Sequence, residues 1–198
     1  MPLSYYLNDN VIFLSKDLLG KFLFTKIEGQ EITGGMIVET EAYRGPEDRA
    51  SHAYKNRRTP RTEAMFKAGG ICYVYLCYGI HHLFNIVTNQ EGIPHAILIR
   101  AIQATTGSDT ILKRRKKTNI APNLTAGPAS LAKALGIEQR HNTQPLTGPI
   151  IWLEDRKIHI PKSQIICSPR VGIHYAQKDA LLPWRFRIRG NPWTSPAK

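Results

Sequence analysis

The stretch Met36-Ile37-Val38-Glu39-Thr40-Glu41-Ala42-Tyr43 carries an apolar run directly into two carboxylates. Alternate side chains of a strand point to the same face, so Glu39 and Glu41 are expected on one side of it. Glu41 would then lie at the end of a buried strand, where a carboxylate is costly unless it is paired or has a chemical role. We therefore consider Glu41 a candidate general base, the alternative being a glutamate exposed on an edge strand.

Similar short apolar and aromatic runs, bounded by Gly, Pro or Asn, are spread over the rest of the chain and are typical of antiparallel strands. Strands are expected at residues 21–27, 36–42, 71–77, 83–88, 95–103, 150–154, 165–167 and 185–189. Thr59-Pro60 indicates the start of one short helical turn, ending at Gly69-Gly70, and Gly127-Pro128 the start of another, ending near Gly136. The predicted fold class is α+β, with residues 1–198 forming a single domain that is mainly antiparallel sheet.

The charge of the chain indicates an acidic partner. The 198 residues include 27 Lys and Arg against 15 Asp and Glu, a net charge of +12, and the excess lies entirely after residue 60. A polyanion is therefore expected to contact the later two-thirds of the chain, the alternative being a dispersed, solvated basic surface. The run Lys113-Arg114-Arg115-Lys116-Lys117, in a stretch from Ala104 to Ala126 with little predicted structure, follows a predicted cap at Ser108. It is interpreted either as a mobile loop that touches phosphate or as solvated surface.

Several protein classes are not supported by the sequence. The longest apolar stretches, such as Ala96 to Ile99, are far shorter than a membrane span, and Met1 to Asn10 does not resemble a secretory leader, so an intracellular protein is expected. Cys72, Cys77 and Cys167 form no C-x-x-C pair, so we expect reduced thiols. Motifs of P-loop, dinucleotide-binding and α/β-hydrolase proteins are absent.

A tyrosine-rich segment around a predicted hairpin is the second candidate region. Tyr73 and Tyr75 share one strand face, and Tyr78-Gly79 supplies the tip. An aromatic tip can act as a wedge between base pairs, and strand tyrosines can sandwich an unstacked base; the alternative is ordinary packing. His81-His82 would point to opposite faces, so no metal site is expected. His52, after the turn Gly45-Pro46-Glu47-Asp48, can fold back over the strand end, although a lone His is usually structural.

Taken together, these residues resemble the alkyladenine (3-methyladenine) DNA glycosylase family, of the type found in mammals and bacteria. The resemblance runs in order over residues 15 to 194. Its motifs are Val38-Glu39-Thr40-Glu41-Ala42-Tyr43, Gly45-Pro46-Glu47-Asp48, Ala50-Ser51-His52, Thr59-Pro60-Arg61, Met65-Phe66, Tyr73-Val74-Tyr75, Tyr78-Gly79, Asn85, Leu98-Ile99-Arg100-Ala101, Gly127-Pro128, Arg170-Val171-Gly172 and Arg189-Gly190-Asn191-Pro192-Trp193.

The resemblance implies catalytic roles for two residues. Glu41 resembles the family's catalytic base, which activates water for attack at the sugar C1′, and Arg100 would help to hold that water. It also implies a monofunctional enzyme without a catalytic lysine, metal or cofactor, acting as a monomer on damaged purines in duplex DNA. Such an enzyme works inside the cell with DNA: in the nucleoid if bacterial, in the nucleus if eukaryotic. The implied fold is similar to the C-terminal domain of methionyl-tRNA formyltransferase, with a protruding hairpin.

The resemblance also implies binding roles. Tyr43, His52 and Tyr75 would line the pocket and sandwich the extruded base, Asn85 would crowd the amino group of normal guanine, and Tyr78 would insert through the minor groove. The sequence does not rank 3-methyladenine, 7-methylguanine, hypoxanthine and ethenoadenine as substrates.

One motif departs from the family pattern, and two other functions remain open. Gly127-Pro128-Ala129-Ser130-Leu131 lacks a glycine and a basic residue that family members usually have after Gly-Pro. A non-catalytic nucleic-acid-binding domain is one alternative, although it would gain nothing from a buried Glu41. A hydrolase of free modified nucleosides is the other, although it would need neither the +12 charge nor an intercalating Tyr78.

Overall fold

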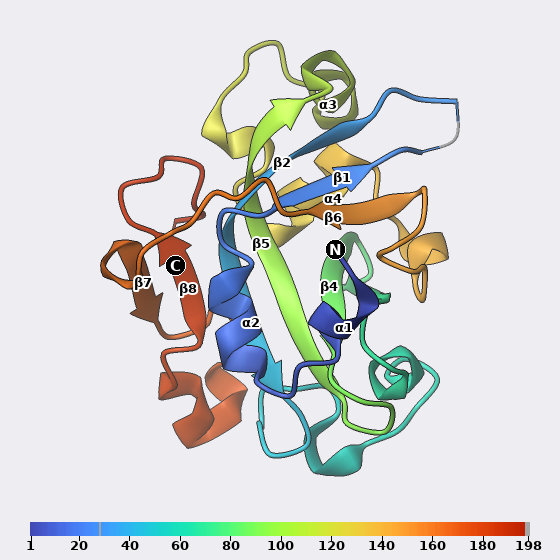
Figure 1. Cartoon of the computed structure of the whole chain (residues 1–198), viewed down its shortest axis with the longest axis vertical. Coiled ribbons are helices and arrows are strands. Elements are labelled where there is room, and N and C mark those ends of the chain that lie inside the picture. The colour runs from blue at the N-terminus through green and yellow to red at the C-terminus, as the bar shows by residue number, and fades with distance from the viewer. Residues whose placement is uncertain (28, 197–198) are drawn as a thin grey trace.

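The computed structural model describes residues 1–27 and 29–196, and all eight of its strands belong to one connected sheet (Figure 1). The strands are β1 Phe22–Thr25, β2 Thr33–Arg44, β3 Cys72–Cys77, β4 His81–Thr88, β5 His95–Thr106, β6 Ile151–Glu154, β7 Ile165–Ser168 and β8 Arg185–Ile188. Their order is β3-β4-β5-β2-β1-β6, with β8 pairing both β2 and β7, and every pairing is antiparallel. The predicted strands and the α+β class are confirmed, with strand ends that shift by a few residues.

The helices are short. They are α1 Leu3–Tyr6, α2 Val11–Asp17, α3 Ser108–Arg115 and α4 Pro128–Leu135, with 3-10 turns at Tyr54–Asn56, Glu63–Phe66, Pro122–Leu124, Gln139–His141, Lys162–Gln164 and His174–Leu181. The prediction for α4 is confirmed: Pro128 is its first residue, and Gly136 ends it at a positive φ of 68°. No helix in the described part of the chain is long and apolar enough to cross a membrane.

Of the other two helical predictions, one holds at its start and one is wrong. The Thr62 N–H donates to the Thr59 hydroxyl at 3.3 Å, and the Thr62 and Glu63 N–H groups donate to the Thr59 carbonyl, so Thr59 caps a turn that begins at Pro60. This turn continues as the 3-10 turn Glu63–Phe66 and ends there rather than at Gly69-Gly70. Ser108 is not a cap: Gly107 holds the N-cap position without a side-chain bond, and Ser108 is the first helical residue.

The basic run lies mostly on a helix rather than in a structureless loop. Lys113, Arg114 and Arg115 form the last turn of α3. This helix is held because Ile111 packs with Leu124 and Ala134 in a small buried cluster.

Strand β2 occupies the centre of the sheet. It pairs with β5 along its length. Its other edge pairs with β1 over residues 33–36 and with β8 over residues 39–41. Register shifts on both sides of Glu39 mark a β-bulge, which bends the strand between these two neighbours. Because β2 has a neighbouring strand on both of its edges, the alternative interpretation, that Glu41 is exposed on an edge strand, is wrong.

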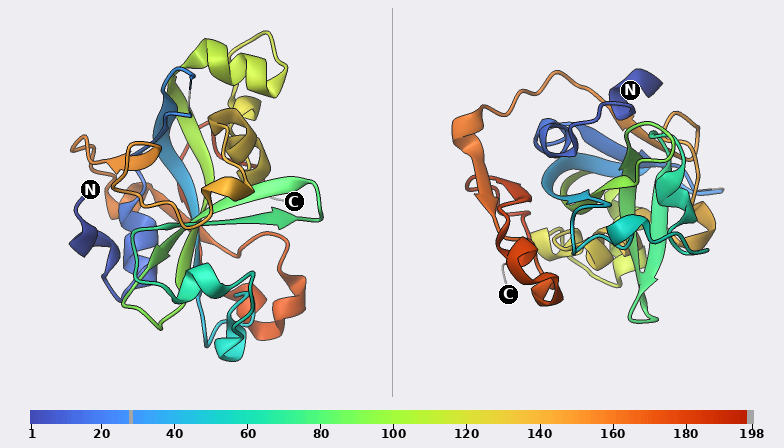
Figure 2. Two further views of the ribbon diagram at one scale, coloured as in Figure 1. Left: turned by 90° about the vertical axis from the view of Figure 1, so that its right-hand side faces the viewer. Right: turned by 90° about the horizontal axis from the view of Figure 1, so that it is seen from below.

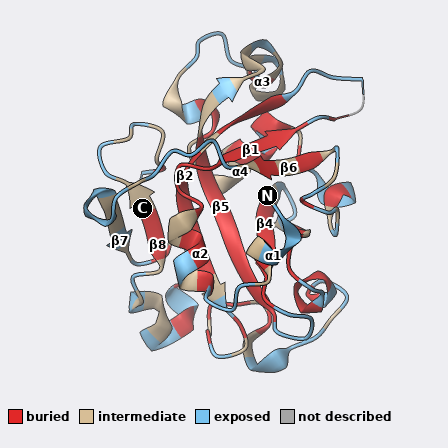
Figure 3. Ribbon diagram, in the orientation of Figure 1, coloured by how far each residue is buried: buried red, intermediate tan, exposed pale blue. Residues whose placement is uncertain are grey.

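The two faces of β2 have different partners. The Thr40 hydroxyl donates to the Ser15 carbonyl of α2 at 2.7 Å, so Thr40 faces α2. Glu39 and Glu41, one residue to either side, therefore face away from α2. Helices α2 and α4 lie on opposite sides of the sheet (Figure 2), and the central strands are buried (Figure 3). The β3–β4 hairpin extends away from this body (Figure 2).

Candidate active site

Two buried glutamates share one arginine. Glu39 and Glu41 are both fully buried, and Arg100 reaches them from β5. The Arg100 Nε lies 2.7 Å from the Glu39 Oε1, and its Nη1 lies 3.2 Å from the Glu41 Oε1. The expectation that both carboxylates share a face is therefore confirmed, and this bridge fixes the guanidinium between them.

Glu39 is engaged on both oxygens. Besides Arg100, it accepts hydrogen bonds from the Arg185 Nε at 2.7 Å, the Ser195 hydroxyl at 2.8 Å and the Ser195 backbone N–H at 2.5 Å. Burial raises the pKa of Glu39, but Arg100 and Arg185 outweigh it and hold the pKa below its usual value. Glu39 is thus a buried structural anion that holds the C-terminal segment and orients Arg100.

Glu41 is held differently. Its Oε1 accepts the Val171 backbone N–H at 2.8 Å, and its Oε2 accepts the Tyr43 hydroxyl at 2.8 Å. Burial and the neighbouring Glu41 raise the pKa of Tyr43 well above its usual value, so this hydroxyl stays protonated and donates. A carboxylate offers about four acceptor positions, so these two donors and Arg100 leave room for one more.

A cavity of about 470 Å³ opens beside this cluster, and we call it the aromatic cavity. Its volume lies within the range of small-molecule sites. Glu41 lies behind its wall: Glu41 is fully buried, while its three partners line the cavity. The other predicted site residues all line it, and they are Tyr43, His52, Tyr75, Tyr78, Asn85 and Arg100. The structure therefore brings together residues from four separate parts of the sequence.

His52 and two tyrosines form the aromatic wall. The His52 Nδ1 lies 2.8 Å from the Tyr73 hydroxyl, and the His52 ring meets the Tyr75 ring edge-on at 4.7 Å between centroids. Burial, and then the nearby Arg61 and Arg57, lower the pKa of His52 to about 4. His52 is therefore uncharged near neutral pH, and the wall presents neutral rings.

Asn85 is fixed within the sheet. It is nearly fully buried, and its Nδ2 donates to the Tyr73 carbonyl at 3.1 Å. Its position on β4 therefore depends on the same hairpin that presents the tyrosines.

The hairpin tip exposes a large aromatic side chain. Tyr78 is 89% exposed, and its neighbour Ile80 is 71% exposed. Tyr78 and Gly79 have φ values of 50° and 71°, and the Ile80 N–H donates to the Cys77 carbonyl, which closes a tight turn. A positive φ is costly for a bulky residue. Because the Tyr78 ring is exposed, packing against the core does not account for it.

Sequence reasoning missed two arginines at this site. The Arg61 guanidinium lies over the Tyr75 ring at 4.8 Å, with its Nη2 3.3 Å from the His52 Nε2. Arg170 is buried in an ion pair with Asp48, and its guanidinium lies 4.7 Å from the Tyr43 ring centroid. The only sequence signal for either was its place in a family motif.

The ion pair of Arg170 has a consequence for Glu41. Asp48 holds Arg170 through both of its oxygens, and the Arg170 Nη1 also donates to the Ala42 carbonyl at 2.8 Å. Val171, which follows Arg170 in the chain, supplies the backbone N–H that donates to the Glu41 carboxylate. The pair thus fixes the loop that orients Glu41.

No group of three or more His, Cys, Asp or Glu side chains in residues 1–27 and 29–196 is placed to hold a metal ion.

Comparison with known proteins connects this geometry to a family. The sequence model of the methylpurine-DNA glycosylase (MPG) family matches residues 5–192. A relative from Chlamydia felis is 49% identical over 189 residues, covering 95% of each chain. Relatives from Bacillus cereus and Clostridium acetobutylicum are 41% and 40% identical over 202 residues, covering 98% of this chain and 98% and 97% of theirs. All three carry the name "Putative 3-methyladenine DNA glycosylase".

Proposed function

Since the chain belongs to the methylpurine-DNA glycosylase family, we propose that it excises damaged purines from duplex DNA by hydrolysis of the N-glycosidic bond, with Glu41 as general base. The observation that carries this proposal is a fully buried carboxylate directly behind an aromatic-lined cavity, held by three groups that line the cavity. A carboxylate that is buried beside a cavity is a candidate catalytic group, because burial and fixed partners can tune its proton affinity in a way that solvent exposure does not.

In the proposed reaction, the damaged nucleotide leaves the duplex and its base enters the aromatic cavity. Water at the remaining acceptor position of Glu41 attacks the sugar C1′ and gives its proton to that carboxylate. The C1′–N bond breaks, and its electron pair leaves with the purine, which an alkylated ring accepts readily because it already carries positive charge. The Arg100 guanidinium, fixed by Glu39, helps to hold the water and the carboxylate in place.

Selectivity is assigned to the walls of the aromatic cavity. The tyrosine rings favour a flat cationic base through cation–π attraction, and the neutral His52 adds no opposing charge. Asn85, held by the Tyr73 carbonyl, would crowd the amino group of a normal guanine. The described residues that line the cavity include no lysine. This supports hydrolysis by water rather than a Schiff-base lyase step.

Duplex DNA is the proposed partner. The net charge of +12 supplies sequence-independent attraction to phosphate. Tyr78, exposed at the hairpin tip, is placed to fill the gap that an extruded nucleotide leaves. We propose that residues 1–198 act as one monomeric glycosylase domain, inside the cell and with DNA.

The test is single-turnover release of base from a panel of duplexes, each carrying one lesion: 3-methyladenine, 7-methylguanine, hypoxanthine or ethenoadenine. Release from at least one methylated purine is expected. Tight duplex binding without release from any member would favour the non-catalytic alternative. A free modified nucleoside that competes as well as the duplex would favour the nucleoside hydrolase.

A further inference from the structure

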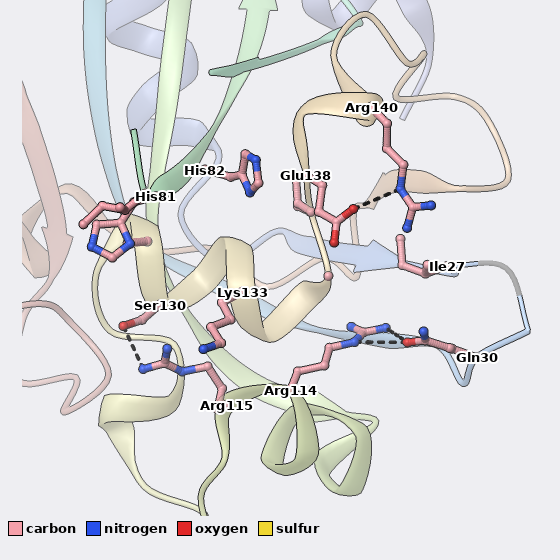
Figure 4. Close-up of a pocket in the computed structure, with 14 residues that line it drawn as sticks. Ile27, Gln30, His81, His82, Arg114, Arg115, Ser130, Lys133, Glu138 and Arg140 are labelled. Atoms are coloured by element: carbon pink, nitrogen blue, oxygen red, sulfur yellow. Dashed lines mark hydrogen bonds and ion pairs between the residues drawn. The ribbon is translucent and has the colours of Figure 1, made fainter. Parts of the chain in front are cut away.

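A second cavity, of about 700 Å³, lies between the β3–β4 hairpin, α3 and α4 (Figure 4). Four cationic side chains and one carboxylate line it, and we call it the basic cavity. These charged residues are Arg114, Arg115, Lys133, Arg140 and Glu138. Figure 4 shows their side chains converging on one space from α3, α4 and the turn that follows α4. Such a lining favours an anion.

The four cations are not equally free to bind one. Arg114 is held by the Gln30 side chain, by the Thr33 hydroxyl at 3.0 Å and by the Ala134 carbonyl at 3.0 Å. Arg140 is paired with Glu138 at 3.1 Å. Most N–H groups of Arg114 therefore already have an acceptor, and the charge of Arg140 is compensated by a carboxylate.

Arg115 and Lys133 are different. The Arg115 Nη2 donates only to neutral oxygens, those of the Ser130 hydroxyl at 3.0 Å and the Asn123 carbonyl at 3.2 Å. Lys133 is exposed on α4, and its side chain points toward Arg115 in Figure 4. Within residues 1–27 and 29–196, no carboxylate forms an ion pair with either. Arg115 and Lys133 therefore face one cavity as positive charges without a carboxylate partner. Arg114 also lacks one, but neutral oxygens already accept from its Nε and from both of its Nη atoms.

The basic cavity adjoins the aromatic cavity along two shared walls. On the hairpin, Tyr78 lines the aromatic cavity while Ile80 and His81 line the basic one. At the start of α4, Pro128 lines the aromatic cavity while Ala129 lines the basic one. Phosphates along one strand of duplex DNA follow one another at about 3.4 Å of helix axis. A duplex that delivers a nucleotide to one cavity thus brings its backbone close to the other.

We propose that the basic cavity binds a backbone phosphate of the duplex beside the extruded nucleotide, with Arg115 and Lys133 as its ligands. The proposal rests on the proposed function for the presence of DNA. Because a phosphate contact carries no sequence information, this site fixes the register of the duplex and leaves selectivity to the aromatic cavity.

The first experiment measures duplex affinity against salt concentration by fluorescence anisotropy, using a duplex that carries one lesion. Each neutralised phosphate adds about −0.9 to the slope of log K against log salt, so Lys133→Ala is expected to reduce that slope by about 0.9. Lys162→Ala is the matched control, since Lys162 is also exposed and lies in a different cavity, beside α2. It removes the same charge and should leave the slope unchanged. Equal slopes for the two variants would overturn the proposal.

The second experiment locates the phosphate. A series of lesion duplexes carries one neutral methylphosphonate at each position around the lesion. At one position, the methylphosphonate should weaken binding by the wild type. At the same position it should have little further effect on Lys133→Ala or Arg115→Gln, because these variants have already lost a charge that binds this phosphate. If neutralisation costs the wild type and both variants equally at every position, the phosphate site is refuted.

The two proposals fail in different ways. If the wild type releases no base, but Lys133→Ala reduces the salt slope and Lys162→Ala does not, the proposed reaction is refuted and the phosphate site is retained. If the wild type releases base normally, but Lys133→Ala leaves the salt slope unchanged, the phosphate site is refuted and the reaction is retained.

Discussion

The aromatic cavity and the basic cavity lie on two sides of the same hairpin, yet they hold charge in opposite ways. Behind the aromatic cavity, Arg100 is buried between Glu39 and Glu41, and each group is hydrogen-bonded at a defined atom. In the basic cavity, Lys133 is exposed and Arg115 bonds only neutral oxygens. The first arrangement fixes geometry, whereas the second leaves charge available.

This difference predicts how each region responds to substitution. Removing one partner of a buried charge cluster leaves an uncompensated charge and costs several kcal/mol, whereas an exposed charge contributes about 0–1 kcal/mol to stability. Changes near the aromatic cavity should therefore alter chemistry or folding. Changes in the basic cavity should alter duplex affinity and its salt dependence.

The largest expected effect separates the two buried glutamates by function. Glu41→Gln preserves shape and removes the proton acceptor, so single-turnover excision should fall by about 10²–10⁴, the usual cost of losing a general base. Affinity for the lesion duplex should change little. Excision within tenfold of the wild-type rate would contradict the assignment of Glu41.

Glu39→Gln should act on folding instead. Its carboxylate compensates both Arg100 and Arg185, so its loss should lower the free energy of unfolding by about 3–5 kcal/mol, measured by urea titration. Glu63→Gln is the control, since it breaks the exposed pair of Glu63 with Arg58 and should lower the free energy of unfolding far less than Glu39→Gln does. Similar losses in the two variants would show that the buried cluster adds no stability beyond that of a surface pair.

The strands were predictable because their signal is local. Short apolar runs between turn residues predicted all eight, and Gly127-Pro128 and Gly136 predicted α4. Helices α1, α2 and α3 were not predicted, because each is too short to show a strong periodic pattern. Helix α3 in particular is mostly polar and charged, and it depends on Ile111 packing against residues later in the chain.

The contacts within the site were not predictable from local patterns. Val171 lies 130 residues from Glu41, and Arg170 lies 122 residues from Asp48. Family motifs supplied the identities of several such residues but not their pairing. The missing basic residue at Ser130 is a similar case, because Arg115 brings a guanidinium to the Ser130 hydroxyl from another helix.

The third effect concerns the hairpin that divides the two cavities. Unstacking a base costs a few kcal/mol, and a wedge offsets part of that cost by stacking on neighbouring pairs. Tyr78→Ala should lower the flipped population by about tenfold, seen with a fluorescent base analogue at the lesion, while Tyr78→Phe should retain most of it.

Tyr78→Gly controls for the backbone, since glycine suits the φ of 50° at this position. Tyr78→Gly and Tyr78→Ala should therefore lower the flipped population to the same extent. An unchanged flipping equilibrium in Tyr78→Ala would make Ile80 or His81 the next candidate for the wedge.

The smallest expected effect tests the neutrality of the aromatic wall. The pKa of His52 in the folded protein is about 4, against an ordinary value of 6.5. Above pH 6.5 His52 is neutral in both states, and its contribution to stability is complete. As the pH falls from 6.5 toward 4, the unfolded chain binds a proton that the folded protein does not bind, so stability is lost.

In His52→Asn this loss is absent, so the difference in free energy of unfolding between wild type and variant should shrink by on the order of 1 kcal/mol between pH 7 and pH 5. Groups that titrate equally in both proteins cancel in that difference. A difference that stays constant over this range would mean that His52 keeps an ordinary pKa. The aromatic wall would then gain a positive charge in mild acid, in addition to the charges of Arg61 and Arg100 that already line the cavity.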